Sequence, residues 1–252
     1  MDESMRFSPS YLEQPSEVPA NPPEVLRSSA LFAGLSESIF SRIASSSTRR
    51  TIARYGSLFA QKEEIRDLVL LESGNIKHTQ AGPNGEEVLL RICAPGEIVA
   101  GPGFSGVSRH RYSARAIDES TVLSWRSEDI RNYMQLHPRF AINVNQILST
   151  RLRELEARIR EFTSEEATTR VALLLVRLSK QLGRAADEGI RIAITQDEIA
   201  QMAGLSMFTV SRMLSRWSDR GLVLTRRQAI IVPDVRRLAR RHETKIAHHE
   251  AR

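Results

Sequence analysis

Two helix-start signals that lie close together constrain this chain more than any other sequence feature. Thr195 and Glu198 predict a capping box, because a hydroxyl and a glutamate three residues later satisfy exposed N–H groups at a helix start. Gly204 can end that helix in a left-handed conformation, and Ser206 is a good N-cap for a second helix that ends at Gly221. Two helices joined by a short glycine-containing turn are typical of a helix-turn-helix.

The second predicted helix has an apolar side and an outward side. Val210, Met213, Leu214 and Trp217 are expected to be buried, and LVLTRRQAIIVPD after the helix predicts two short strands, which form a wing. The N-terminal half of such a helix enters the major groove of DNA. The candidate DNA-binding residues are Thr195, Gln196, Ser206, Met207, Phe208, Thr209, Ser211, Arg212, Arg216, Arg226 and Arg227.

The positive charge is concentrated in the same part of the chain. Residues 163–252 hold 16 Lys and Arg against 10 Asp and Glu, whereas residues 1–162 hold 20 of each. The whole net charge of +6 therefore lies in the C-terminal third. This distribution favours a nucleic-acid partner for that third, although a basic segment that only maintains solubility would give the same count.

Other classes of protein are disfavoured by what the sequence lacks. The longest apolar run, Val171–Val176, is too short to cross a membrane, and the N-terminus has no apolar signal core. The single cysteine, Cys93, forms no internal disulfide and holds no metal cluster alone, so we expect a cytoplasmic protein without metal or cofactor. The six histidines are scattered and no catalytic motif is present, so we do not expect an enzyme.

The first half of the chain has a different residue pattern. Residues 1–24 contain five of the ten prolines and predict a flexible arm. Apolar residues between 25 and 43 recur near helical spacing, and residues 51–125 then show short β-type runs separated by turn signals. These runs predict a small antiparallel barrel or roll. Further along, GRAADEG at 183–189 is interpreted as a linker.

A long helix is predicted after Pro138, with a narrow apolar seam. The seam repeats at intervals of 4, 4, 3, 4 and 3 residues and is flanked by Arg and Glu, which favours a coiled-coil-like contact between two copies over an ordinary core helix. The candidate dimer-interface residues are Val144, Leu148, Leu152, Leu155, Ile159 and Phe162.

The order of these parts resembles the cAMP receptor protein/fumarate–nitrate regulator (Crp/Fnr) family of bacterial transcription regulators. The motifs are LFAGLSE at 31–37, APGEIVAG at 94–101 and ITQDEIAQMAGLSMFTVSRML at 194–214. The resemblance implies an α+β fold with a cyclic-nucleotide-binding-like β-roll, a long dimerisation helix and a C-terminal winged helix-turn-helix. The expected divisions are a flexible arm at 1–24, an effector or sensor roll at 25–137, the dimerisation helix at 138–162, the DNA-binding domain at 163–234 and a basic tail at 235–252.

The chain departs from the family's cAMP-binding pattern. Gly96 and Glu97 match the cassette in which a glutamate takes the ribose hydroxyls, but Arg111 is followed by Tyr112 where those members have Arg-Ser or Arg-Thr. Leu155 and Glu156 stand where those members offer Thr and Ser to adenine. We therefore expect no cAMP dependence and an unknown small-molecule effector, if any is used. The candidate effector pocket consists of Gly96, Glu97, Arg111, Ser113, Arg151 and Leu155.

Other sensing chemistries of the family are also not expected. The N-terminal arm lacks the cysteine cluster of the oxygen-sensing branch. His78 lies outside the region where a haem ligand would be expected and is interpreted as a histidine on a strand surface. Cys93 is interpreted as a small core residue without an obvious base partner, and a redox role for it remains an alternative.

The resemblance also implies how DNA is read. Ser211 and Arg212 match the Ser-Arg pair of the fumarate–nitrate branch, but Phe208 replaces a common glutamate, so we expect a different half-site. The implied function is a dimeric, sequence-specific regulator with double-stranded DNA and RNA polymerase as partners. The alternatives are a degenerate member that acts through protein contacts, and a sensor of a small molecule other than a nucleotide.

Overall fold

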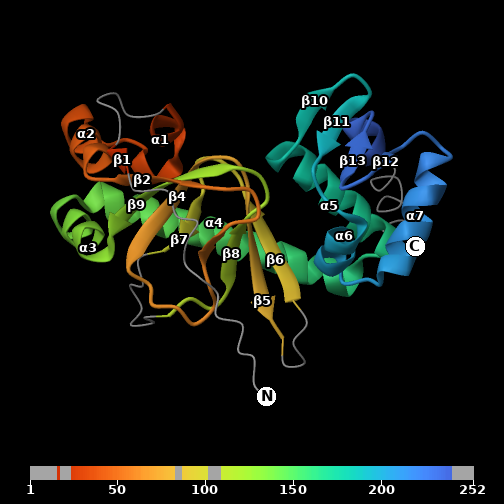
Figure 1. Cartoon of the computed structure of the whole chain (residues 1–252), viewed down its shortest axis with the longest axis horizontal. Coiled ribbons are helices and arrows are strands. Elements are labelled where there is room, and N and C mark those ends of the chain that lie inside the picture. The colour runs from red at the N-terminus through yellow and green to blue at the C-terminus, as the bar shows by residue number, and fades with distance from the viewer. Residues whose placement is uncertain (1–15, 18–23, 83–86, 102–108, 240–252) are drawn as a thin grey trace, which may run out of the picture. The chain divides into compact units, whose positions relative to one another are not determined.

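The computed structural model describes residues 16–17, 24–82, 87–101 and 109–239 (Figure 1). The chain divides into two compact units, one of residues 1–87 and 91–148, and one of residues 88–90 and 149–252. We call them the roll unit and the winged unit. Most of the predicted flexible arm, and the predicted tail beyond residue 239, lie outside the described residues.

The roll unit is built from two antiparallel sheets, as the sequence predicts. The five-stranded sheet has the order β1 (Ser16–Glu17), β2 (Thr48–Ile52), β9 (Ser120–Arg126), β4 (Asp67–Ser73) and β7 (Ile98–Ala100). The four-stranded sheet has the order β3 (Ser57–Phe59), β8 (Ser113–Ala116), β5 (Ile76–Ala81) and β6 (Glu87–Cys93). The paired strands run antiparallel, and pairs such as β2 with β9 and β5 with β8 join strands that are far apart in the sequence.

Short helices accompany these sheets. The stretch at 25–43 forms three pieces rather than one helix: α1 (Glu24–Ser28), the 3-10 helix η1 (Ala30–Phe32) and α2 (Glu37–Ser45). The Ser29 side chain accepts the N–H of Leu31, and Gly34 takes a φ of +70°, so local capping and a turn override the helical spacing. The remaining helices are α3 (Ser127–Leu136) and α4 (Pro138–Ser164).

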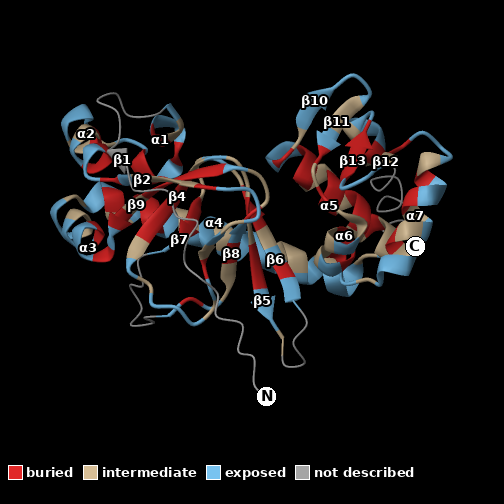
Figure 2. Cartoon of the chain, in the orientation of Figure 1, coloured by how far each residue is buried: buried red, intermediate tan, exposed pale blue. Residues whose placement is uncertain are grey.

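Strand β4 separates two hydrophobic cores in the roll unit. Leu68 and Leu70 pack with the short helices around Trp125, whose indole N–H donates to the Ile43 carbonyl at 2.6 Å. Val69 and Leu71, which point the other way along the strand, pack into the interior of the roll. Both faces of β4 are thus buried, as the red strand in Figure 2 shows.

The winged unit combines helices with a third antiparallel sheet. Its helices after α4 are α5 (Ala167–Gln181), α6 (Gln196–Ala203) and α7 (Met207–Ser218). Its sheet has the order β10 (Arg184–Ala186), β11 (Gly189–Ile192), β13 (Ala229–Val232) and β12 (Leu224–Arg226).

Two boundaries in this unit differ from the sequence-based expectation. The predicted linker at 183–189 is wrong, because Arg184 pairs with Arg191 in a β-hairpin that adds an edge to the sheet. The packed fold also continues past residue 234, since the Asp234 side chain caps the next turn and Leu238 is buried. In the sequence, Leu238 four positions after Asp234 is only a weak helix signal, because the residues around it are mostly arginines.

Candidate nucleic-acid interface

The first helix of the helix-turn-helix begins at the predicted capping box. The Glu198 N–H donates to the Thr195 hydroxyl at 3.1 Å, and the Thr195 N–H donates to the Glu198 carboxylate at 3.0 Å. Two N–H groups that would otherwise lack partners are thereby satisfied within one turn. The capping box fixes the start of α6, and the buried residues Ile199 and Ala203 follow it on the same helix.

The turn between α6 and α7 depends on Gly204. Its φ of +62° and ψ of 45° place it in the left-handed region, as predicted. A Cβ at this position would lie 2.8 Å from the ring of Phe162, so the site needs glycine for its contact as well as for its backbone angle. Ser206 then begins α7, with its hydroxyl accepting the Thr209 N–H at 3.2 Å.

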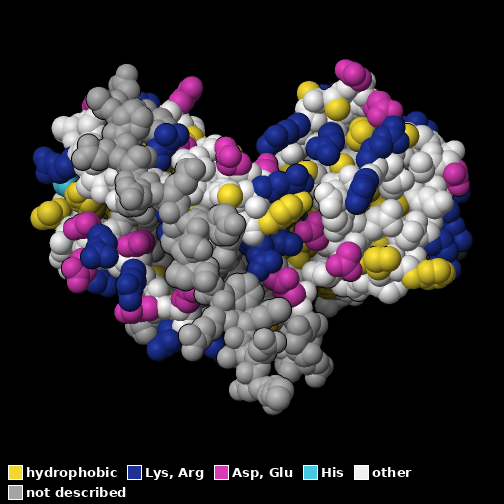
Figure 3. Space-filling view, in the orientation of Figure 1, with side chains coloured by type: hydrophobic (Ala, Val, Ile, Leu, Met, Phe, Trp, Pro, Cys, Tyr) yellow, Lys and Arg dark blue, Asp and Glu magenta, His cyan; other side chains and the backbone are white. Residues whose placement is uncertain are grey.

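Helix α7 buries one side and exposes the other. Val210, Leu214 and Trp217 are buried and Met213 is half-buried, which agrees with the predicted apolar side. The outward residues Arg212, Ser215 and Arg216 are exposed, together with Met207 at 56% and Phe208 at 73%. Figure 3 shows hydrophobic and basic side chains at the surface over α7.

Phe208 and Arg212 lie against each other on this exposed side. The guanidinium carbon of Arg212 is 5.7 Å from the centroid of the Phe208 ring, within the range of a cation–π contact. The Phe208 ring is thus at the surface and is not packed inside the domain. Sequence reasoning identified both residues but not their contact, although a spacing of four on a helix could have indicated it.

Several hydroxyls predicted to contact DNA are engaged within the protein. Thr195 both accepts from and donates to Glu198, and the hydroxyls of Ser206 and Thr209 lie 2.9 Å apart. Gln196 and Ser211 are half-buried at the start and on the flank of the two helices. The hydroxyls of Thr195, Ser206 and Thr209 thus help to fix the starts of α6 and α7, whereas other residues of α7 are more exposed.

The wing carries its two predicted arginines at the surface. Strands β12 and β13 pair from Leu224 with Ile231 to Arg226 with Ala229, so the turn consists of Arg227 and Gln228. Arg227 is exposed, but Arg226 is held by a bidentate ion pair to Glu188, with distances of 2.8 and 2.9 Å. Glu188 was missed by sequence reasoning because it was placed in a linker, not in the neighbouring hairpin.

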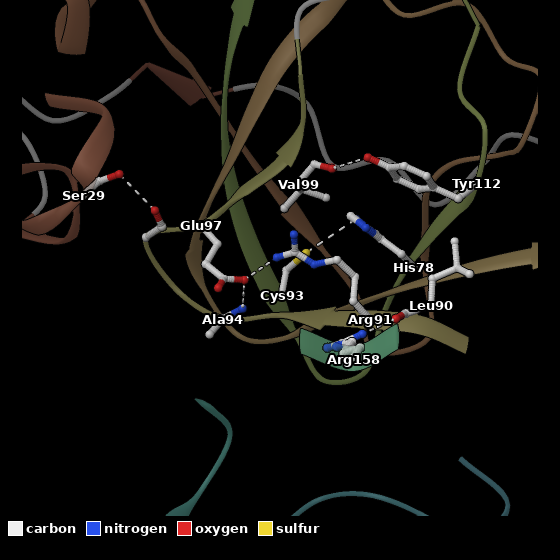
Figure 4. A network of polar contacts seen from close by, with 11 residues as sticks. Ser29, His78, Leu90, Arg91, Cys93, Ala94, Glu97, Val99, Tyr112 and Arg158 are labelled. Atoms are coloured by element: carbon white, nitrogen blue, oxygen red, sulfur yellow. Dashed lines mark hydrogen bonds and ion pairs between the residues drawn. The ribbon is translucent and has the colours of Figure 1, made fainter. Parts of the chain in front are cut away.

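The predicted effector residues in the roll serve its own structure. Gly96 has a φ of +86°, donates its N–H to the Leu71 carbonyl at 2.8 Å and accepts the Ser29 hydroxyl at 2.9 Å. One oxygen of the Glu97 carboxylate accepts from Arg91 at 2.5 Å and from the Ala94 N–H at 3.2 Å (Figure 4). The glutamate that matches the cassette is thus bound to Arg91 of β6 and to the backbone of Ala94, the residue after that strand.

The rest of the predicted pocket is not brought together by the described contacts. Arg111 is exposed, and the Ser113 hydroxyl accepts the Gln61 N–H at 3.0 Å. Arg151 and Leu155 belong to the winged unit, whereas the other predicted pocket residues belong to the roll unit. Most of the loop that follows the cassette, residues 102–108, lies outside the described residues.

Aromatic and histidine side chains fill the roll interior. His78, interpreted from the sequence as a surface residue, is only 1% exposed and stacks on Tyr112 with ring centroids 4.2 Å apart. Its Nε2 lies 3.5 Å from the sulfur of Cys93, which is fully buried as predicted but does have an imidazole beside it (Figure 4). The strand period carried the missed signal, because His78 follows the buried Ile76 by two residues.

A second stack continues this interior. The imidazole of His110 lies on the ring of Phe59 with a centroid distance of 3.6 Å and an interplanar angle of 10°. Burial lowers the pKa of His110 below its ordinary value, and the nearby charge of Glu63 opposes that shift only in part. The Tyr112 hydroxyl donates to the Val99 carbonyl at 3.1 Å, so this polar group has a partner inside the roll.

Comparison with known proteins agrees with both units. Residues 49–137 match the cyclic nucleotide-binding domain, and residues 169–241 match the Crp-like helix-turn-helix domain. The chain is 26% identical over 220 residues to a CRP-like cAMP-activated global transcriptional regulator of Mycobacterium tuberculosis, covering 86% of this chain and 98% of that one. It is 29% identical to the cyclic AMP receptor protein of Thermus thermophilus, covering 79% of this chain and 89% of that protein.

The chain belongs to the Crp/Fnr family. The structure of FixK2 from Bradyrhizobium japonicum has the same fold, with a TM-score of 0.66, 19% identity and coverage of 77% of this chain and 96% of that one. This Crp/Fnr member is therefore a transcription regulator with a helix-turn-helix DNA-binding domain. Its α+β architecture, with a β-rich domain followed by the winged helix-turn-helix, is the one that the sequence predicts.

The predicted dimer seam of this Crp/Fnr regulator is corrected at its first residue. Val144 is 5% exposed and packs in the core of the roll unit with Phe140, so it is not available to a second copy. Leu148, Leu152, Leu155 and Ile159 are exposed on α4. Phe162, the last seam residue, is partly occupied by its contacts with Gly204 and with the Arg170 guanidinium.

The described residues of this Crp/Fnr regulator show neither a metal-ligand cluster nor a membrane span. Among these residues, no three or more His, Cys, Asp or Glu side chains gather as metal ligands would. The helices in the described ranges also include none with the length and apolar character needed to span a bilayer.

Proposed function

We propose that this regulator acts as a homodimer that reads a palindromic DNA site through α7 without requiring cyclic AMP. The observation that carries the proposal is the exposed side of α7, where Met207, Phe208, Arg212 and Arg216 reach solvent beyond a rigidly capped turn. Arginine can make a bidentate contact with guanine, and the wing arginines lie where phosphates would be the nearer partners.

Dimerisation is supported by the exposed part of the α4 seam. Four large apolar side chains, Leu148, Leu152, Leu155 and Ile159, stand at coiled-coil spacing and are each more than half exposed. A second copy would cover them and would place two recognition helices about 34 Å apart, one helical turn of DNA. We further propose RNA polymerase as the protein partner at promoters. The proposed location is the cytoplasm.

Independence from cyclic AMP is supported by the interior of the roll. Glu97 is already paired with Arg91, and Tyr112 follows Arg111 where a small hydroxyl residue would help to hold a cyclic phosphate. His78, His110, Tyr112 and Phe59 pack together in the roll. Calorimetric titration with cyclic AMP and cyclic GMP should therefore give no binding heat, and a micromolar isotherm would overturn this part of the proposal.

Selection of DNA from a library with randomised half-sites tests the proposal as a whole. The full-length protein should enrich a palindrome, and Arg212→Ala should weaken binding to it by about 1–3 kcal/mol and relax one base position. Replacing Arg226 and Arg227 together by alanine should weaken binding to every sequence alike and flatten its salt dependence. If no sequence is enriched, the protein acts through protein contacts instead.

A further inference from the structure

We infer that Phe208 and Arg212 form one reading unit, which selects a thymine next to a guanine in each half-site. The inference rests on the proposed function and adds the specificity of this particular chain. It starts from the exposure of Phe208, whose large apolar ring is 73% exposed on a short helix that buries its other side. An exposed ring on the side of α7 proposed to enter the major groove can be covered there by the thymine methyl group.

The second step is the contact between the two side chains. Phe208 and Arg212 are four residues apart on α7, so they lie on the same side of the helix. Long helical side chains lean toward the N-terminus, which brings the Arg212 guanidinium back over the ring at 5.7 Å. The ring thereby restricts the arginine to a direction along the N-terminal half of α7, the half that enters the groove.

The third step converts this geometry into a base pattern. The guanidinium can donate to O6 and N7 of guanine, and the face of the ring not covered by the arginine is open to a methyl group. Successive bases on one strand are about 3.4 Å apart. Two groups held 5.7 Å apart therefore span less than two base steps, and the inference assigns them to neighbouring bases. A carboxylate at position 208 would instead accept a hydrogen bond from the N4 amino group of cytosine. Phenylalanine at this position therefore changes which base is selected as well as the affinity for DNA.

Deoxyuridine provides the direct test, because it differs from thymidine only by the missing methyl group. The full-length protein should bind its selected duplex about fourfold more weakly when deoxyuridine replaces the thymine beside the guanine, the factor expected for burying one methyl group. The same replacement at a thymine elsewhere in the half-site serves as the DNA control and should have no effect.

Two variants separate the methyl contact from the contact with arginine. Phe208→Ala should remove the discrimination between thymine and uracil and also reduce the preference for guanine about threefold, because the guanidinium loses its support. Phe208→Leu is the matched control: it should keep the discrimination against uracil, since leucine still covers a methyl group, but reduce the guanine preference as alanine does.

The outcomes distinguish this inference from the function on which it rests. If the wild-type protein selects a site but binds thymine and uracil equally, or if Phe208→Ala keeps the full discrimination, the reading unit is wrong and the proposed function stands. If the protein enriches no duplex, the proposed function and this inference are both wrong.

Discussion

The two units treat their polar and aromatic groups in opposite ways. In the winged unit, Thr195 and Ser206 cap the backbone, and the longer side chains of Phe208 and Arg212 remain at the surface. In the roll unit, Glu97 is paired with Arg91, and His78 and Tyr112 stack inside the fold. The winged unit therefore exposes long side chains on α7, whereas the described part of the roll unit packs polar and aromatic side chains against one another.

The difference bears on the two proposed properties of the regulator, DNA binding by α7 and independence from cyclic AMP. Binding by α7 depends on exposed residues that can be exchanged without disturbing the core. A ligand bound inside the roll would need polar groups that have no partner within the protein. Each hydrogen bond that such a group makes within the protein leaves one group fewer for the ligand.

The open surface of α4 should be essential for DNA binding. Changing Leu152 and Ile159 together to aspartate should give monomers and lower the affinity for the palindromic site at least a hundredfold, because the second half-site is no longer linked. Sedimentation and titration with labelled duplex measure the two effects. Arg160→Asp, exposed on the same helix, is the control and should remain dimeric; a dimeric double variant would show that the seam is misassigned.

The turn of the helix-turn-helix should be more sensitive than another glycine with the same backbone angle. Gly204 and Gly221 both have a φ of +62°, but only at Gly204 would a Cβ meet a neighbour, the Phe162 ring at 2.8 Å. Both alanine variants should lose about 1 kcal/mol of stability from backbone strain, and Gly204→Ala should lose about 1 kcal/mol more. Equal losses in urea unfolding would mean that Phe162 moves aside freely.

The closed interior of the roll should make stability depend on pH. Burial lowers the pKa of His110, so the unfolded chain binds a proton more readily than the folded one. The contribution of His110 is therefore fully present above the unfolded pKa of about 6.5 and is lost as the pH falls through the folded value. The free energy of unfolding should decline over that range, and His110→Phe should decline less; identical slopes would contradict the assignment.

The smallest expected effect concerns the wing. Glu188 holds Arg226 in an exposed ion pair, with both side chains about half accessible to solvent. Glu188→Gln should free the arginine, tighten binding to all duplexes by a few fold and steepen the salt dependence by about one counterion. Asp187→Asn, one residue away, controls for the general loss of negative charge. An equal gain in both variants would assign the effect to net charge rather than to the ion pair.

Local signals made the winged unit predictable from the sequence. The capping box at Thr195, the left-handed Gly204 and the N-cap Ser206 each act within a few residues, and all three are confirmed. The roll was predictable as a class of fold, but the stacking of His78 on Tyr112 was not, because it forms only after β5 pairs with β8, which lies much further along the chain. The burial of Val144 and the pairing of Glu188 with Arg226 were missed for the same reason.

The most direct test of the account is one binding measurement made twice. Full-length protein is titrated onto its selected palindromic duplex, first alone and then with a saturating excess of cyclic AMP. If α7 binds DNA and the roll does not bind the nucleotide, binding should be tight and the dissociation constant should be the same in both titrations. A tenfold or greater tightening by cyclic AMP, or no binding in its absence, would contradict the account.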